Sequence, residues 1–170
     1  MRRIALAGLL AMTVALTAGA AAPGPRMPIE SFKQLQQPLP LPYDEGANAD
    51  RAVAGAMAKA RKDGRLVLID LGGNWCLDCR VLAGTMGTQP LRSWLSAHYE
   101  IVLVDVGRFN KNLHVSRRFG VFGKLEGVPA VLVVNPRTGK LVNRGHVTAL
   151  ADARNMTPQS LADWLARWVS

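Results

Sequence analysis

Hydrophobic and polar positions follow two periodicities along this chain, and they predict an alternation of helices and strands. Between residues 47 and 62 apolar side chains recur at helical spacing and form one face, which ends at Asp63-Gly64. The next stretch, Leu66 to Leu71, is apolar almost throughout, as is typical of a strand covered on both faces. Its one interruption is Asp70. The pattern therefore predicts a helix followed by a buried strand that carries one acid.

The same two patterns continue toward the carboxyl end. Further helices are predicted at residues 76–88, 91–97 and 111–119, and a last one that Thr157 caps and Pro158 opens. Further strands are predicted at residues 100–106, 128–134 and 140–147, the last two joined as an antiparallel hairpin by the turn at 136–139. The sequence thus predicts one α/β domain over residues 47–170, with a mixed sheet of four to five strands and helices on both faces.

The amino-terminal 46 residues differ from the rest. Met1-Arg2-Arg3 precedes an uncharged apolar run, and Ala18-Gly19-Ala20 is a small-x-small cleavage pattern. Residues 1–20 are therefore interpreted as a secretory signal peptide, and an uncleaved anchor is the alternative. Residues 21–46 are rich in proline and predict an arm or linker. We expect a periplasmic protein with no stable membrane insertion after cleavage.

Charge changes this picture little. The chain carries a formal net charge of +9, and without Arg2 and Arg3 the sum is +7. The basic residues are scattered apart from Arg117-Arg118, and no basic stripe alternates with aromatic residues. A solvated basic surface explains this distribution better than a nucleic-acid site does. We expect a monomer that binds no nucleic acid.

The only two cysteines lie in the stretch GGNWCLDCR, as Cys76 and Cys79. A disulfide that closes so short a loop would constrain little of the unfolded chain, so chemistry is favoured over a structural role. Two thiols could also bind Cu(I), but tetrahedral zinc needs two more ligands. His98, His114 and His146 are isolated in the sequence, and no metal site is predicted.

The position of the two cysteines suits thiol–disulfide exchange. Cys76 follows the glycine break and begins the predicted helix, whose amino end lowers the pKa of a thiol there. Cys79 lies three residues further, one turn deeper on the same side. Cys76 is therefore the predicted entry nucleophile, and Cys79 is the thiol that resolves a mixed disulfide. The pair is the only redox centre expected, with no added cofactor.

Trp75-Cys76-x-x-Cys79 after an apolar strand, with the later Val128-Pro129, resembles the thioredoxin superfamily. The resemblance runs from about Leu66 to the carboxyl end, with one helix before it. It implies a thioredoxin fold and a thiol–disulfide oxidoreductase that acts on protein thiols and a redox partner protein. It also implies that Asp70 takes part in proton transfer from the resolving cysteine. Trp75, Val128 and a cis Pro129 would border the site.

Leu77-Asp78 between the cysteines departs from the Gly-Pro of thioredoxin. The carboxylate of Asp78 would oppose a nearby thiolate, whereas Arg80 and the helix end would favour one. The Asn-Trp-Cys-x-Asp-Cys form is similar to periplasmic thioredoxin-like proteins and to the carboxyl-terminal domain of DsbD. That similarity implies a reductase or electron relay, and an oxidase or isomerase is the alternative. Residues 119–127 are longer than the matching segment of thioredoxin and could shape a partner groove.

Overall fold

A three-stranded sheet forms the centre of the protein. The computed structural model describes residues 23–169. The sheet consists of β1 (Leu66–Gly72), β2 (Tyr99–Asp105) and β3 (Ala130–Val134) in the order β2-β1-β3. The central strand β1 is parallel to β2 and antiparallel to β3, which confirms the predicted mixed sheet. The helices are α1 (Ala49–Asp63), α2 (Leu77–Met86), α3 (Leu91–His98), α4 (His114–Arg118) and α5 (Pro158–Ala166), with short 3-10 turns η1 (Phe32–Gln34) and η2 (Ala153–Asn155).

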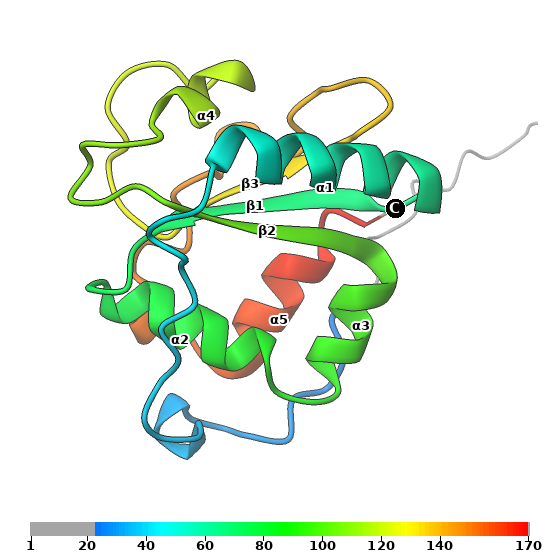
Figure 1. Cartoon of the computed structure of the whole chain (residues 1–170). Helices are drawn as coiled ribbons and strands as arrows, with labels where there is room; N and C mark the ends of the chain where they lie inside the picture. Colours follow the sequence, from blue (N-terminus) through cyan, green and yellow to red (C-terminus); the bar gives the residue numbers. More distant parts are fainter. Residues whose placement is uncertain (1–22, 170) are drawn as a thin grey trace, which may run out of the picture.

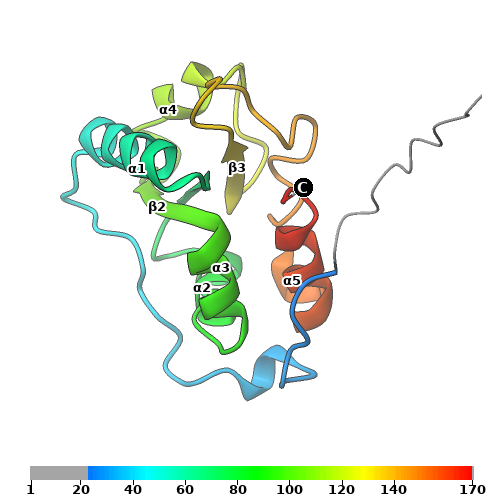
Figure 2. The same ribbon diagram turned by 90° about the vertical axis from the view of Figure 1, so that its right-hand side faces the viewer.

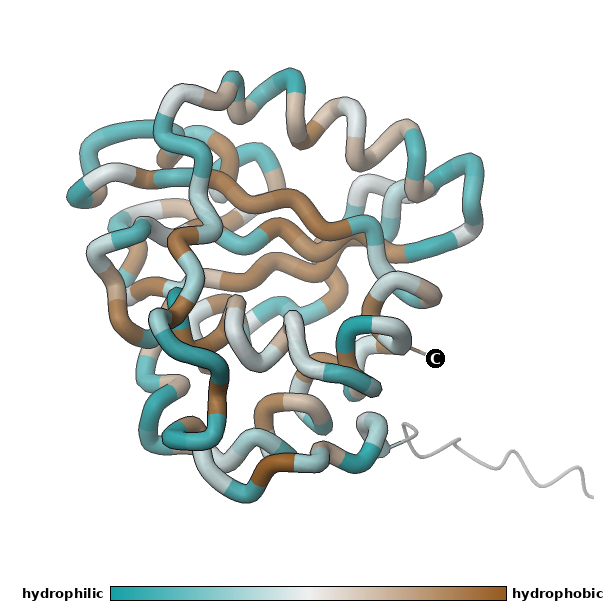
Figure 3. The backbone as a smooth tube through the Cα atoms, turned by 60° about the horizontal axis from the view of Figure 1, so that its bottom comes forward, coloured by the Kyte–Doolittle hydropathy of each residue, from teal (hydrophilic) through white to brown (hydrophobic). Residues whose placement is uncertain are grey.

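Helices cover both faces of the sheet, as the sequence predicts. Figure 1 shows α1 above the strands and α2, α3 and α5 below them, and the turned view in Figure 2 gives the same two layers. All residues of β1 after Leu66 are buried, because helices pack on both of its faces. Figure 3 shows the consequence as hydrophobic strands inside a more polar outer shell. The α/β fold class is therefore confirmed.

Each face of the sheet has its own hydrophobic core. The alternating residues Val67, Ile69 and Leu71 of β1 belong to the core between the sheet and α1. Leu68 belongs to the core between the sheet and the helices α2, α3 and α5. The period of two along a strand separates the two sets. The predicted stripe on the last helix lies in the second core, where Leu161 and Leu165 are fully buried.

The predicted strand at residues 140–147 is wrong. Only Leu141 forms an isolated bridge to Val134, so the described residues give three strands rather than four or five. Backbone hydrogen bonds join Val142 to Val133 and Val147 to Val131, and between them the side chain of Asn143 pairs with β3. Its Oδ1 accepts the N–H of Val133 at 2.9 Å and its Nδ2 donates to the carbonyl of Val131 at 2.8 Å. Because this side chain satisfies β3 between the two backbone contacts, the backbone does not have to run extended from Val142 to Val147.

Local signals place most helix ends correctly. Gly64 ends α1 in the left-handed conformation with φ 72°, and Thr157 caps α5 through its side chain. The helix predicted at 111–119 shortens to α4, because Asn112 has φ 55° and interrupts its first turn.

The proline-rich arm lies along the domain. Near its start, the N–H of Gly24 donates to Asp163 and that of Met27 donates to Gln159, both of which lie on α5. The arm then forms η1 and runs past α2 before it reaches α1 (Figures 1 and 2). The predicted signal peptide lies outside the described residues. Within residues 23–169, no helix has the length and apolar character to cross a membrane.

Candidate active site

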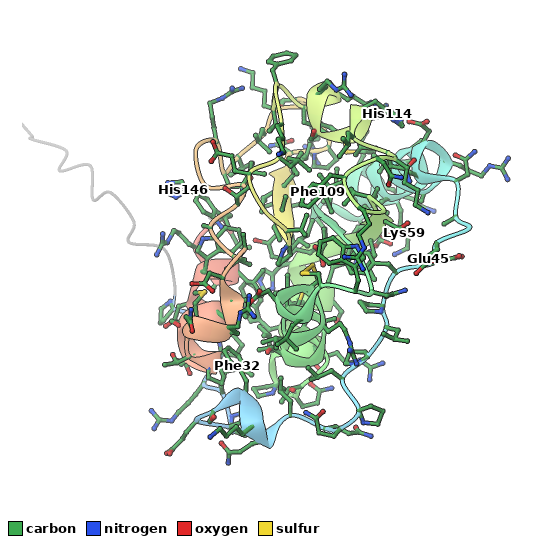
Figure 4. All side chains as sticks on the ribbon, turned by 90° about the vertical axis from the view of Figure 1, so that its left-hand side faces the viewer. Phe32, Glu45, Lys59, Phe109, His114 and His146 are labelled. Atoms are coloured by element: carbon green, nitrogen blue, oxygen red, sulfur yellow. A yellow bond between two sulfur atoms is a disulfide. The ribbon has the colours of Figure 1, made fainter. Side chains whose placement is uncertain are left out.

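The disulfide between Cys76 and Cys79 lies at the amino end of α2. The strand β1 ends at Gly72, and the N–H of Cys76 bonds to the carbonyl of Gly73 at 3.0 Å to close the turn. Cys76 then caps α2, because its Sγ accepts the N–H of Cys79 at 3.1 Å. A covalent bond joins the two sulfurs, which appear as a yellow bond at this end of the helix in Figure 4. The helix terminus therefore directs a backbone donor at the sulfur of Cys76.

The two sulfurs differ in access. Cys76 is 6% exposed and Cys79 is completely buried. Sγ of Cys76 lies 3.4 Å from the carbonyl oxygen of Val128, at the start of the segment that leads into β3. The peptide bond between Val128 and Pro129 is cis. The structure thus brings the cysteine pair and the Val128-Pro129 pair together, as the sequence predicts.

Asp70 lies on the central strand, two residues before Gly72, and has no exposed surface. Burial raises the pKa of its carboxyl to about 7, and the hydroxyl of Tyr43 offsets part of that rise. At neutral pH this carboxyl exists in both protonation states in comparable amounts. It can therefore either accept or give up a proton at neutral pH.

Asp78 is almost as deeply buried, at 3% exposure, and it is bound by a residue from far along the chain. Its Oδ1 accepts the backbone N–H of Arg154 at 2.9 Å, and its Oδ2 lies 2.9 Å from Nη2 of the same arginine. The expected opposition between Asp78 and a thiolate is therefore offset by a cation that the sequence analysis did not consider.

This chain is similar to known proteins in sequence and in fold. The family model described as thioredoxin-like matches residues 48–136, which is more than half of the chain. The crystal structure of a disulphide isomerase from Xylella fastidiosa Temecula1 is 38% identical over 75% of this chain and 96% of that one, with a TM-score of 0.68. The chain belongs to the thioredoxin-like family. The cysteine pair on this fold makes it a thiol–disulfide oxidoreductase, which acts on protein thiols and redox partners.

Other comparisons add less. A structure named DsbH oxidoreductase is 16% identical over 67% of this thioredoxin-like chain and 94% of its own, with a TM-score of 0.41. The comparison with curated proteins finds no match.

Trp75 and Leu77 flank Cys76 on the surface of the thioredoxin-like domain, with 42% and 47% of their area exposed. Nε1 of Trp75 donates to the carbonyl of Gly107 at 2.7 Å. The guanidinium of Arg108 lies 4.6 Å from the centre of the indole ring, and Phe109 contacts the ring edge-on. These contacts fix the orientation of the indole while part of it stays open to solvent beside the disulfide.

Arg80 contacts the arm. The sequence predicts that its charge favours a thiolate, and its guanidinium donates to the carbonyls of Leu39 at 2.7 Å and Pro40 at 3.1 Å. Its bonds therefore hold the arm against α2 of the thioredoxin-like domain.

Two residues of the site were missed by sequence reasoning. Tyr43 comes from the proline-rich arm, and Arg154 comes from η2. Neither lies in a periodic pattern or beside the cysteines, and so no local signal marks them. Asn74 was inside the quoted motif but received no role; its side chain holds the backbone of Tyr43 through two hydrogen bonds of 3.0 and 2.8 Å.

The histidines do not join the site. His114 contacts Asp50, His98 bonds to the carbonyl of Trp94, and His146 packs near Trp168. Across the described part of the chain, no cluster of three or more His, Cys, Asp or Glu side chains could hold a metal ion.

Proposed function

We propose that this protein is a periplasmic reductase or electron relay that transfers two electrons from its cysteine pair to protein disulfides. The observation that carries the proposal is a buried group at the end of β1: Asp70 interacts with the hydroxyl of Tyr43, and that hydroxyl and the sulfur of Cys79 both approach Gly72. A base at that position favours attack by Cys79 on a mixed disulfide, which releases the substrate in reduced form.

The proposed reaction has two exchange steps. The thiolate of Cys76 attacks a substrate disulfide, forms a mixed disulfide, and one substrate sulfur leaves as a thiolate. Cys79 then loses its proton and attacks the sulfur of Cys76, and the second substrate thiolate leaves. The substrate gains two electrons and the pair is oxidised to the disulfide present in the structure. A redox partner protein restores the dithiol for the next cycle.

The surface around Cys76 suits a protein substrate. Trp75 and Leu77 are exposed apolar side chains beside the less buried sulfur. Phe122, in the long segment before Pro129, is 79% exposed. That segment lines a surface pocket together with Leu141, Arg144 and Val147. We expect a partner chain to contact Trp75 and Leu77 beside Cys76, and we expect the protein to act as a monomer.

Insulin reduction tests this function. Reduced wild-type protein should cleave insulin disulfides, Cys76→Ser should abolish the reaction, and Cys79→Ser should accumulate mixed disulfides through Cys76. The reduction potential then fixes the direction, since about −270 mV is typical of a reductant and about −120 mV of an oxidant. Undiminished insulin reduction by Cys76→Ser would contradict the mechanism.

Isomerisation is the second candidate, because the 38% identical relative is described as a disulphide isomerase. An isomerase needs Cys76 to attack and leave repeatedly without resolution by Cys79. Recovery of activity from a protein with scrambled disulfides distinguishes the two. If the protein is a reductase, the scrambled substrate should regain little activity when the wild-type protein is added. It should regain at least as much activity when the Cys79→Ser variant is added.

The proposed location depends on the amino-terminal sequence. Residues 1–20 have the features of a signal peptide. Fractionation of cells that produce the full chain should place a shortened protein in the periplasm. A full-length protein in the membrane fraction would favour the uncleaved anchor instead.

A further inference from the structure

The side chains of Tyr43 and Cys79 both pack against Gly72. A Cβ atom added at Gly72 would overlap the hydroxyl and ring of Tyr43 and would lie 2.8 Å from Sγ of Cys79. Such a contact is closer than atoms tolerate, and so only glycine leaves room for both groups here. The phenol from the arm and the sulfur from α2 therefore approach the same point at the end of β1.

The polar groups around this point lack ordinary partners. Among residues 23–169, neither the hydroxyl of Tyr43 nor either carboxylate oxygen of Asp70 has a hydrogen bond of standard geometry, although all three atoms are buried. Leaving buried polar groups unpaired is unfavourable, and such groups are rare in native proteins. Tyr43 and Asp70 nevertheless lie close enough to affect each other's pKa. A group of this kind is commonly retained for function.

The arm holds Tyr43 in place through contacts with the active-site elements. The side chain of Asn74 bonds to both the N–H and the carbonyl of Tyr43. Nζ of Lys111 donates to the carbonyl of Glu45 at 2.9 Å. With the two bonds from Arg80, these contacts fix the arm on both sides of the tyrosine. The backbone that carries this side chain is thus attached to the loop before the cysteines.

The charged surroundings keep this hydroxyl neutral. Burial, followed by the charge of Asp70 and a smaller effect of Asp105, raises the pKa of Tyr43 above its usual value. Asp105 itself is paired with Lys111. Tyr43 therefore does not ionise to a phenolate that could act as a base. A neutral hydroxyl can still accept one proton while it donates another.

We propose that the hydroxyl of Tyr43 relays the proton of Cys79 to Asp70 when Cys79 releases a bound substrate, a role that rests on the proposed function. The Sγ–H proton of Cys79 passes to Oη of Tyr43 as the Oη proton passes to the carboxylate of Asp70. The sulfur of Cys79 forms a bond with Sγ of Cys76, and the bond between Cys76 and the substrate sulfur breaks. The electron pair of that bond leaves with the substrate thiolate. Tyr43 ends the step unchanged, and Asp70 later gives its proton to solvent.

The test is Tyr43→Phe, which removes only the hydroxyl. The chain has two tyrosines, and Tyr99→Phe is the matched control, because it removes a buried hydroxyl that bonds to the carbonyl of Leu165 away from the site. Each reduced protein is mixed with glutathione disulfide and quenched with acid at set times. Mass spectrometry then counts the reduced, mixed-disulfide and oxidised forms.

We expect Tyr43→Phe to form the mixed disulfide at the wild-type rate and to resolve it about tenfold more slowly at pH 7. The pH midpoint of resolution should move upward by about one unit, since Asp70 loses the donor that favours its ionised form. Tyr99→Phe should keep both the rate and the midpoint of the wild type. A merely structural role would alter stability without moving this midpoint.

Two outcomes would overturn the inference. If Tyr43→Phe resolves at the wild-type rate and midpoint while Asp70→Asn is slow, the proton passes to Asp70 directly and the proposed function stands. If the wild-type protein forms no mixed disulfide and no oxidised form, the proposed function fails and the relay fails with it.

Discussion

Asp78 and Arg154 form a two-point contact that fastens η2 to the amino end of α2. One carboxylate oxygen accepts the backbone N–H of Arg154 and the other meets its guanidinium, each at 2.9 Å. The carboxylate is buried, while the arginine side chain stays 53% exposed. The acid between the two cysteines is therefore both hydrogen-bonded and neutralised. Its influence on a Cys76 thiolate depends on a residue that lies 76 positions away in the sequence.

Arg154→Gln should make the cysteine pair more reducing. The variant keeps the backbone bond but leaves the charge of Asp78 uncompensated near Cys76, which disfavours a thiolate in the reduced protein. We expect the reduction potential to become more negative by on the order of 30 mV, which corresponds to a tenfold change in the equilibrium constant. Equilibration with glutathione measures it. Arg137→Gln, at an exposed turn, is the control. Adding Asp78→Asn should cancel the shift, and a potential that never moves would contradict this interpretation.

Asp70→Asn should stabilise the protein at alkaline pH. The pKa of Asp70 rises from 3.8 to about 7 on folding, so the folded state holds its proton more tightly than the unfolded state does. The free energy of unfolding therefore falls as pH rises from about 4 to 7 and stays lower above that. The loss is at most about 4 kcal/mol, and asparagine avoids it.

Urea unfolding of the oxidised proteins measures this effect. The variant should match the wild type near pH 4 and exceed it at pH 8. Asp44→Asn, at an exposed position, should show no such divergence. Parallel stability curves for wild type and Asp70→Asn would show that the carboxyl ionises freely in the folded state.

Asn74→Ala should loosen the arm. The substitution removes both hydrogen bonds to the backbone of Tyr43, and a typical intramolecular bond contributes about 1 kcal/mol. We expect a destabilisation of about 1–3 kcal/mol and faster hydrogen exchange in residues 39–46. Asn135→Ala is a suitable comparison, because Asn135 likewise makes two hydrogen bonds to the backbone, both accepted from N–H groups in the turn after β3. Equal exchange in the arm of both variants would argue against Asn74 as its anchor.

Asn143→Ala should destabilise the edge of β3. The amide of Asn143 is completely buried and satisfies one donor and one acceptor of that strand. Its removal leaves both groups unpaired, and we expect a loss of about 2–4 kcal/mol in the free energy of unfolding. Denaturant unfolding measures the loss. Asn155→Ala removes only an exposed bond to Asp152 and should change stability by less than about 0.5 kcal/mol.

The failed prediction at residues 140–147 shows where periodicity misleads. The segment KLVNRGHV contains enough apolar residues to suggest a strand. Between the backbone contacts of Val142 and Val147, the buried side chain of Asn143 pairs with β3, and Gly145 has φ 81°. Strand propensity describes how side chains fit a pleated surface, and it does not register a side chain that substitutes for the backbone.

The sequence by itself determined the features that depend on neighbouring residues. Helix periodicity, the glycine stop at Gly64, the buried strand β1 and the start of α2 at the cysteines all follow from local spacing and capping. Only the tertiary structure decided what surrounds the cysteines. Tyr43, Arg154 and the final direction of Arg80 depend on packing between distant segments, which short-range patterns do not encode. The sulfur chemistry was therefore visible in nine residues, whereas the groups proposed to tune it became visible only once the arm and η2 had folded against them.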